Sequence, residues 1–275
     1  MFKLIMFVIL VLIMAFPVKT SAQSQEVTIN GDHGKLSAVI QRPENKSKYP
    51  LVILCHGFTA DKENALITTL ADELEAVGIA SIRFDFNGHG KSEGRFQDMT
   101  VLNEIEDAKK VYEYVSTLPE VTSISIAGHS QGGVVTSMVA GQLGTDKVKC
   151  IALLAPAAVL REDAIRGMLQ DVQYDSLNPP EYILIKSPHG DFKVGRNYVK
   201  VAQTLPIYET AIAFQGPACL IHGTGDIVVP YTYSLRYAHT YTNSELHLLP
   251  AFDHGFTQDV KKAAKIAADF FVRVH

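Results

Sequence analysis

The chain has 275 residues, of which 47% are hydrophobic, so it can bury a large core, and α/β folds of this length often form one domain. The net charge is -4 at pH 7 and there is no run of Lys and Arg, which excludes a protein whose overall charge attracts nucleic acid. An acidic substrate would have to be bound by local groups rather than steered by the entire surface.

The chain begins with a segment that has the features of a secretory signal peptide. Lys3 supplies a positive charge, and residues 4–16 form an unbroken apolar run that is short for a membrane span. Small residues at 20–22 offer a cleavage point. We therefore expect residues 1–22 to be removed and the protein to be exported, either to the periplasm or outside the cell, with no stable membrane span. The alternative is an uncleaved anchor, which Lys19 favours.

The three cysteines, Cys55, Cys150 and Cys219, each lie in an apolar run typical of a buried strand. Buried free cysteine behaves as a small hydrophobic residue, so we expect all three to be unpaired. No spacing of cysteine and histidine resembles a zinc site, and the sequence predicts neither a metal nor a cofactor.

Beyond residue 22, short runs rich in Val and Ile alternate with longer amphipathic stretches. This alternation predicts one α/β domain over residues 23–275, with a mostly parallel central sheet and helices on both faces. The expected strands lie within residues 26–30, 35–43, 49–57, 79–90, 121–130, 147–158, 216–223 and 245–255, the first two as an antiparallel hairpin. The expected helices lie within residues 63–77, 101–117, 131–143 and 257–274.

Residues 157–208 interrupt this alternation, because they do not fit a single helix. They hold two consecutive prolines, several glycines and four tyrosines. Insertions of this length in a compact domain are usually functional, so we expect a lid subdomain here. A solvated excursion is the alternative, and the aromatic content argues against it.

Ser130 lies between an expected strand and an expected helix, with Gly128 and Gly132 two residues to either side. The pattern Gly-x-Ser-x-Gly in this context is typical of a nucleophile elbow, whose tight turn excludes side chains at both glycine positions. The serine hydroxyl is then exposed near the positive end of the following helix. As a bare pattern the motif is weak, since a tight turn also needs small residues.

A serine nucleophile needs a base, and the base needs a carboxylate. Among ten histidines, His254 is the best candidate for the base, because it follows the last strand and precedes the last helix. Asp226 is the best candidate for the carboxylate, because it lies in a glycine-rich loop after the preceding strand. The chain order Ser130, Asp226, His254 is that of the α/β-hydrolase arrangement.

Other histidines and aspartates are weaker candidates for these roles. His222 is interpreted as a loop-packing residue, and the side chain of His129 is expected to point away from the reacting side. Asp253 is adjacent to His254 in sequence, and neighbours rarely face one another. Asp85 is expected to serve loop structure.

Acyl transfer also needs hydrogen-bond donors for the developing oxyanion. The backbone N–H of Gln131 is one candidate, because it opens the helix after the elbow. The other is the N–H of Phe58 in the sequence His56-Gly57-Phe58, which follows an expected strand. A plain turn glycine at Gly57 is the alternative.

Taken together, these motifs resemble the bacterial cinnamoyl (feruloyl) esterases of the α/β-hydrolase fold. The resemblance covers nearly all of the chain after residue 22 and rests on "LCHGF", "FDFNGHGKSEG", "GHSQGG", "LLAPAA", "QTLPIYE", "LIHGTGDIVVP" and "DHGF". The elbow and triad motifs are common to many hydrolases. The segments "GHSQGG", "LAPAAVLREDA" and "NYVKVAQTLPIYE" are more specific.

The resemblance implies that the insertion forms a lid over the acyl pocket and that three lid residues bind the phenolic hydroxyl of the substrate. Carried over position by position, these residues are Asp163, Gln170 and Tyr198, with Gln173 an alternative to Gln170. The middle of the lid departs from the family. Asp163 could instead cap a helix, and Tyr198 could belong to the core.

We therefore expect a serine esterase that releases ferulate or p-coumarate from plant cell-wall esters through an acyl-enzyme. Its partner would be a small or polysaccharide-linked hydroxycinnamate ester. The alternatives are a general carboxylesterase, an acylglycerol lipase, and a non-catalytic member of the fold. The sequence makes no prediction of oligomeric state.

Overall fold

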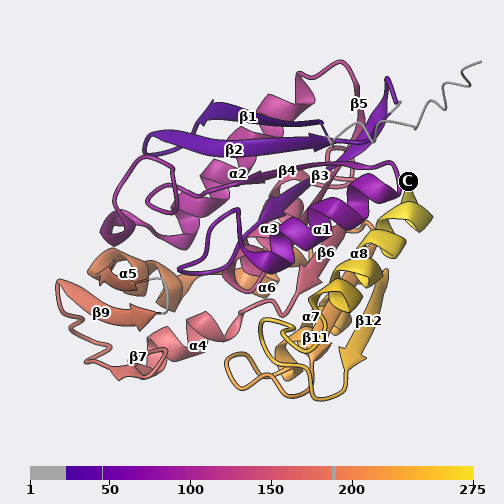
Figure 1. Cartoon of the computed structure of the whole chain (residues 1–275). Helices are drawn as coiled ribbons and strands as arrows, with labels where there is room; N and C mark the ends of the chain where they lie inside the picture. The colour runs from indigo at the N-terminus through magenta and orange to yellow at the C-terminus, as the bar shows by residue number, and fades with distance from the viewer. Residues whose placement is uncertain (1–22, 45, 188–189) are drawn as a thin grey trace, which may run out of the picture.

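A twisted eight-stranded sheet forms the centre of the protein in the computed structural model, which describes residues 23–44, 46–187 and 190–275 (Figure 1). The expected signal peptide, residues 1–22, lies outside the described residues. In spatial order the strands are β1 (Gln23–Asn30), β2 (Lys35–Arg42), β4 (Ala80–Phe84), β3 (Tyr49–Cys55), β5 (Val121–His129), β6 (Ile151–Leu154), β11 (Ala218–Gly223) and β12 (Ser244–Leu249).

The sheet is mostly parallel, as the sequence predicts. β1 pairs antiparallel with β2, and β2 pairs antiparallel with β4. The remaining neighbours, from β4 to β12, pair in parallel. The central parallel strands are buried on both faces, which explains their continuous Val, Ile and Leu runs. Parallel pairing brings the carboxyl ends of these strands to one edge of the sheet.

Helices cover both faces. α1 (Ala65–Ala76) and α8 (Val260–Val274) pack on one face, where they share a core cluster with one set of strand side chains. α2 (Val101–Ser116), α3 (Gln131–Leu143), α6 (Ile207–Ala211) and α7 (Thr232–Thr240) contribute to the core cluster on the other face. α7 was not predicted from the sequence, because its polar and aromatic residues mask its helical period.

The segment expected as an insertion folds into small elements outside the sheet, at the lower left of Figure 1. They are α4 (Val159–Arg166), the hairpin β7 (Met168–Leu169) and β8 (Val172–Gln173), the hairpin β9 (Tyr182–Ser187) and β10 (Gly190–Gly195), and α5 (Arg196–Thr204). The ring of Phe192 on β10 packs against that of Phe96 in the short 3-10 helix η1 (Phe96–Asp98), with ring centroids 4.6 Å apart. These contacts attach the insertion to the loop after β4.

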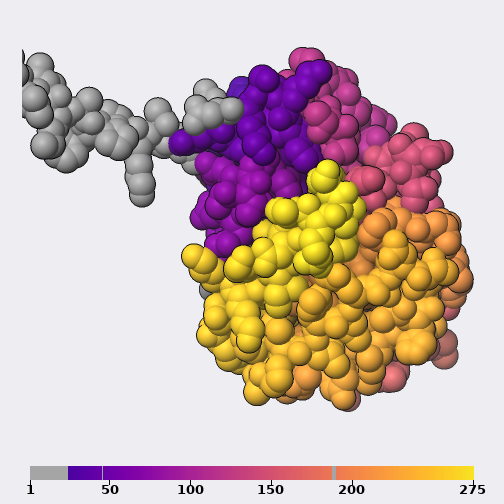
Figure 2. Space-filling model, turned by 90° about the vertical axis from the view of Figure 1, so that its right-hand side faces the viewer, coloured from indigo at the N-terminus to yellow at the C-terminus, as the bar shows by residue number. Residues whose placement is uncertain are grey.

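The C-terminal third of the chain gathers on one side of the molecule, which Figure 2 shows facing the reader. All three cysteines are buried and free, as predicted. None of the helices in the described part of the chain combines the length and the apolarity that a membrane crossing requires.

Candidate active site

Ser130 occupies a strained turn between β5 and α3. Its φ of 56° and ψ of -123° place a residue with a side chain in a region that such residues rarely adopt. A Cβ at Gly128 would lie 2.1 Å from the carbonyl oxygen of Gly132, and a Cβ at Gly132 would lie 2.3 Å from that of His56. The predicted need for glycine at both positions is confirmed.

Ser130, His254 and Asp226 meet at the carboxyl edge of the sheet. The Oγ of Ser130 lies 2.9 Å from Nε2 of His254, and Nδ1 of His254 lies 2.7 Å from Oδ2 of Asp226. An ionised Asp226 can accept hydrogen bonds but cannot donate them, so Nδ1 of His254 carries the proton. Nε2 of His254 therefore accepts the hydrogen bond from the Ser130 hydroxyl. Consecutive hydrogen bonds of this kind are the geometry of a serine-histidine-aspartate triad.

Asp226 is held by hydrogen bonds to both of its oxygens. Oδ1 accepts the N–H groups of Val228 and Val229, each at 2.8 Å, and Oδ2 accepts from His254 and, at 3.1 Å, from Nε2 of His222. Burial alone would raise the pKa of Asp226, but the hydrogen bonds from His222 and His254 hold it well below its usual range. Asp226 therefore stays ionised at neutral pH.

His222 is a site residue whose contact with Asp226 the sequence analysis missed. It is fully buried, and its Nε2 faces both Asp226 and the carbonyl oxygen of Val229 at 2.9 Å. Two acceptors require a proton on Nε2, so Nδ1 accepts the hydroxyl of Ser234 at 2.7 Å. Loop packing is thus only part of its role. The available signal was its place near the end of β11, four residues before Asp226.

His129 does not point away from the site, contrary to expectation. Its ring centroid lies 4.9 Å from that of His254, and its Nε2 donates to the carbonyl oxygen of His254 at 2.8 Å. Burial, followed by the neighbouring His254, lowers the pKa of His129 to about 3. The neutral ring therefore supports the backbone of the histidine loop.

The two other aspartates hold loops together, which was predicted for Asp85. Asp253 accepts the N–H of Thr257 at 2.8 Å and also its hydroxyl, which closes the loop that follows His254. Asp85 is fully buried and pairs with Lys62, whose Nζ lies 2.7 Å away. It also accepts the N–H of Lys91 and so joins two loops.

The two predicted oxyanion donors flank the nucleophile. Gln131 is the first residue of α3, and a Cβ at Gly57 would lie 3.0 Å from that of Ser130, so the loop that carries Phe58 lies against the serine. No acceptor among the described residues takes the backbone N–H of Phe58 or of Gln131. Both groups are available to a developing oxyanion.

The side chain of Gln131 joins the elbow to the insertion. Its Nε2 donates to Glu104 of α2 at 2.8 Å, and its Oε1 accepts the hydroxyl of Tyr198 of α5 at 2.7 Å. Tyr198 is only 4% exposed, and its ring packs 5.5 Å from that of Phe58. The phenol donor of Tyr198, predicted to serve the substrate, is therefore already used within the protein.

Asp163 lies close to this network. Its carboxylate is half-buried, and no described group donates a hydrogen bond to it. Burial raises its pKa, and Arg166 offsets part of that shift. Burial and the charge of Asp163 raise the pKa of Tyr174 to about 12, and the same charge acts on Tyr198. The structure thus brings Asp163 together with Tyr198 and adds Tyr174, which the sequence analysis did not single out.

Gln170 does not join them. It occupies the turn between β7 and β8 with a φ of 52°, and its side chain is exposed. The alternative, Gln173, is exposed as well. The glutamine that anchors this region is Gln203 of α5, whose Nε2 donates to the carbonyl oxygens of Ala164 and Ser176 at 3.1 and 2.7 Å. A substrate contact from Gln170 would require the hairpin to move.

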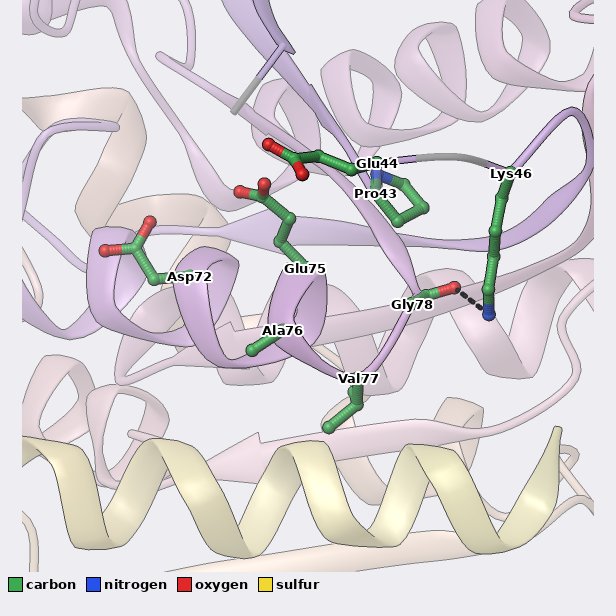
Figure 3. Close-up of a pocket in the computed structure, with 8 residues that line it drawn as sticks. All are labelled: Pro43, Glu44, Lys46, Asp72, Glu75, Ala76, Val77 and Gly78. Atoms are coloured by element: carbon green, nitrogen blue, oxygen red, sulfur yellow. Dashed lines mark hydrogen bonds between the residues drawn. The ribbon is translucent and has the colours of Figure 1, made fainter. Parts of the chain in front are cut away.

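A surface hollow of about 650 Å³ lies elsewhere, at the C-terminal end of α1, and contains no triad residue. Figure 3 shows three carboxylates in it, Glu44, Asp72 and Glu75, and Lys46 Nζ donating to the carbonyl oxygen of Gly78 at 3.1 Å. The hollow is open and acidic, whereas a pocket for an aromatic acid needs apolar walls. It is not the site of the chemistry.

Comparison with solved structures identifies the fold family. Est1E from Butyrivibrio proteoclasticus, solved with ferulic acid bound, is 32% identical, covers 90% of this chain and 98% of its own, and superposes with a TM-score of 0.85. The chain belongs to the α/β-hydrolase family. As a member of that family it resembles Est1E, and carboxylic ester hydrolysis is the class of reaction that the comparisons support.

Other matches cover a smaller part of this α/β-hydrolase. A family model described as serine aminopeptidase, S33, matches residues 46–174. Mouse palmitoyl-protein thioesterase ABHD10 is 25% identical over 195 residues, which cover 70% of this chain and 64% of the relative. An uncharacterized Escherichia coli protein is 33% identical over 111 residues, which cover 40% and 38%. The chain thus spans between about two fifths and two thirds of the length of these curated relatives.

Proposed function

We propose that this α/β-hydrolase is a serine carboxylic-ester hydrolase that acts on hydroxycinnamate esters such as those of ferulate and p-coumarate. The hydrogen-bonded triad of Ser130, His254 and Asp226 carries the reaction type. The similarity to Est1E, solved with ferulic acid bound, supports the substrate class. No metal or cofactor enters the mechanism.

The mechanism follows from the hydrogen bonds. His254 Nε2 takes the Ser130 proton as Oγ attacks the ester carbonyl, and Asp226 stabilises the imidazolium. The N–H groups of Phe58 and Gln131 bind the oxyanion. The alcohol leaves with the proton from His254. Water, activated by the same imidazole, then hydrolyses the acyl-enzyme.

The surroundings of Asp163 support an aromatic acid as the acyl group. Aromatic side chains lie nearby, and the half-buried carboxylate has no donor of its own. A phenolic hydroxyl at the far end of a flat substrate is a suitable donor for such an acceptor. In this proposal the insertion acts as the lid of the acyl pocket.

The cellular setting is part of the proposal and rests on the sequence of residues 1–22. A signal peptide there would carry the enzyme to the periplasm or outside the cell, where polysaccharide-linked esters of plant walls are found.

The test is hydrolysis of methyl ferulate by purified protein and by the Ser130→Ala variant. We expect wild-type turnover, covalent labelling by a fluorophosphonate, and loss of both in Ser130→Ala. Ser123→Ala is the control, because that hydroxyl bonds to His275 on a different part of the sheet. Absence of labelling in folded wild-type protein would favour a non-catalytic member of the family.

A second candidate is an esterase or acylglycerol lipase for apolar acyl chains. It is favoured by apolar side chains exposed next to Asp226, where Ile227 is 95% and Val228 is 56% exposed. Rates on p-nitrophenyl esters of rising chain length, compared with methyl ferulate, separate the two. Efficient cleavage of long-chain esters with untouched methyl ferulate would replace the first candidate by the second.

A further inference from the structure

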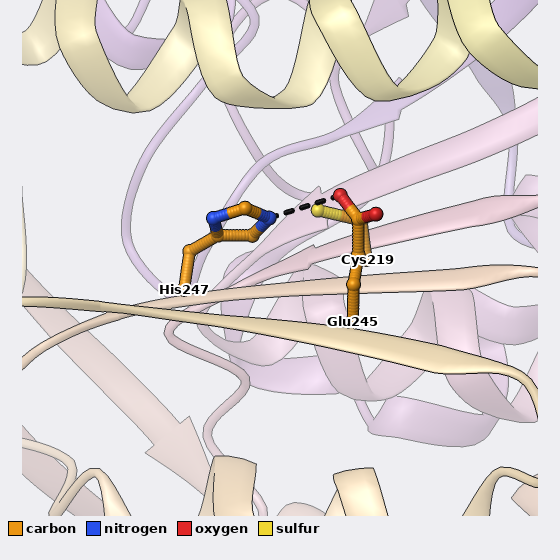
Figure 4. A group of neighbouring side chains, drawn as sticks. All are labelled: Cys219, Glu245 and His247. Atoms are coloured by element: carbon orange, nitrogen blue, oxygen red, sulfur yellow. Dashed lines mark hydrogen bonds and ion pairs between the residues drawn. The ribbon is translucent and has the colours of Figure 1, made fainter.

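Three side chains suited to metal binding meet on β11 and β12, away from the triad. Cys219 lies on β11 directly opposite Glu245 of β12, and His247 follows two residues later. Their possible ligand atoms, Sγ, a carboxylate oxygen and a ring nitrogen, lie within 4.8 Å of one another. In Figure 4 the sulfur of Cys219 and the imidazole of His247 lie beside the carboxylate of Glu245.

The strand geometry explains why these residues meet. Residues two apart on a strand share a face, so Glu245 and His247 point to the same side as the paired Cys219. That side is covered by α8, whose Arg273 reaches Glu245. Cys219 is fully buried, whereas the Glu245 and His247 side chains are 37% and 38% exposed. The thiol thus forms the floor of a site that solvent enters past the other two.

Thiolate, imidazole and carboxylate are the three ligand types that Zn²⁺ prefers in proteins. Tetrahedral zinc bonds of ordinary length place ligand atoms about 3.3–3.6 Å apart. The present spacing of at most 4.8 Å exceeds that arrangement by no more than about 1.5 Å, a change that rotation of the half-exposed side chains supplies. Three protein ligands leave a fourth position for water.

Arg273 and His247 already bind Glu245, and a metal has to be compatible with both. Arg273 Nη2 lies 2.6 and 2.8 Å from the two carboxylate oxygens, and His247 Nε2 lies 2.9 Å from Oε1. A cation bound to Oε1 would also bind Nε2 of His247 in place of the present hydrogen bond, while Arg273 would still donate to Oε2. A carboxylate ligand that is hydrogen-bonded on its other oxygen is a common arrangement around metals.

We propose that Cys219, Glu245 and His247 form a binding site for Zn²⁺. Binding displaces the thiol proton to solvent. The site lies near the amino ends of the two strands, about 13 Å along each strand from the carboxyl end that leads to Asp226 or His254. Among the described strands β12 pairs with β11 alone, so the metal ties this edge strand to the sheet rather than taking part in ester hydrolysis.

Cobalt(II) is the probe, because thiolate-bound Co²⁺ has a near-ultraviolet charge-transfer band that carboxylate and imidazole ligands lack. We expect metal-free wild-type protein to develop this band at one equivalent and to lose it when Zn²⁺ is added. Cys219→Ser should abolish the band, and His247→Ala should weaken Co²⁺ binding about tenfold or more. Cys150→Ser is the matched control, since Cys150 is also buried but bonds to Ser125.

A wild-type protein without the band overturns the proposal, as does a band that persists in Cys219→Ser. Zinc should also raise the melting temperature of the wild type and of Cys150→Ser, but not of Cys219→Ser. An equal rise in all three overturns the site. If Cys219→Ser does not fold, His247→Ala decides, because its side chain is half-exposed and an unchanged affinity there contradicts the ligand set.

Discussion

At the scale of single residues, the acid of the triad depends on more than its bond to the base. Asp226 accepts four hydrogen bonds, and the one from His222 comes from a ring whose tautomer is set by Ser234 and Val229. A hydrogen bond to a charged group contributes about 1.5–3 kcal/mol. His222 is therefore a positioning residue for the reaction.

His222→Gln should lower kcat/KM about ten- to a hundredfold, because Asp226 loses a fixed donor and no longer holds His254 as firmly. Steady-state kinetics on an ester that the wild type cleaves would measure this, with folding checked by circular dichroism. His239→Gln is the control, since that histidine is exposed on α7. A folded His222→Gln enzyme with wild-type kcat/KM would show that the contact has no part in the reaction.

The carboxylate of Asp163 has a role in the proposed function that substitution can test. If its carboxylate accepts the phenol of the substrate, Asp163→Asn should lower kcat/KM for methyl ferulate about tenfold or more. Methyl cinnamate, which lacks the phenol, should be affected little. Equal losses on both esters would instead assign Asp163 to the structure of α4.

At the scale of secondary-structure elements, one buried chain of hydrogen bonds joins α2, the elbow and the insertion. It runs from Glu104 through the amide of Gln131 to the hydroxyl of Tyr198. The backbone of Gln131 also carries an expected oxyanion donor. The position of α5 is therefore coupled to the geometry of the oxyanion site.

Tyr198→Phe removes the donor and leaves a buried amide oxygen unpaired, which costs about 1–3 kcal/mol. We expect a lower urea midpoint and a fall in kcat/KM that is equal for methyl ferulate and methyl cinnamate. Tyr182→Phe is the control, because Tyr182 is exposed on β9 of the same insertion. A loss confined to methyl ferulate would return Tyr198 to the role of a phenol-binding residue.

At the scale of the whole molecule, buried ionisable groups make the stability depend on pH. Burial raises the pKa of Glu104 from 4.5 to about 8, with a smaller opposing effect of the Gln131 hydrogen bond. The folded state thus holds a proton that the unfolded state has lost above pH 4.5. The stability from this group is complete below that pH and is lost as the pH rises through about 8.

Glu104→Gln removes this pH-dependent loss of stability and keeps an acceptor for the Gln131 amide. The wild type should match the variant near pH 4.5 and become progressively less stable than it between pH 5 and 8, by at most about 1.4 kcal/mol per pH unit. Urea unfolding across this range measures the difference, with the exposed Glu106→Gln as control. A difference that stays constant with pH would contradict the buried acid.

The parallel sheet, the elbow and the order of the triad were accessible from the sequence, because they depend on local patterns. Buried strands are apolar runs, and the turn at Ser130 admits only glycine at Gly128 and Gly132. The partners of the triad were less accessible. His222 and His129 look alike in sequence, and only their distances to Asp226 and His254 distinguish them from packing residues.

The fold class and the candidate triad residues could be predicted from the order of residues along the chain, since strand ends and turn chemistry are local properties. Tertiary structure alone decided the use of Tyr198, the exposure of Gln170 and the meeting of Cys219 with Glu245 and His247. Each of these depends on which side chains the packing of α5, of the β7–β8 hairpin or of β11 on β12 brings within hydrogen-bond distance. Such contacts join residues far apart in the chain, and no local pattern records them.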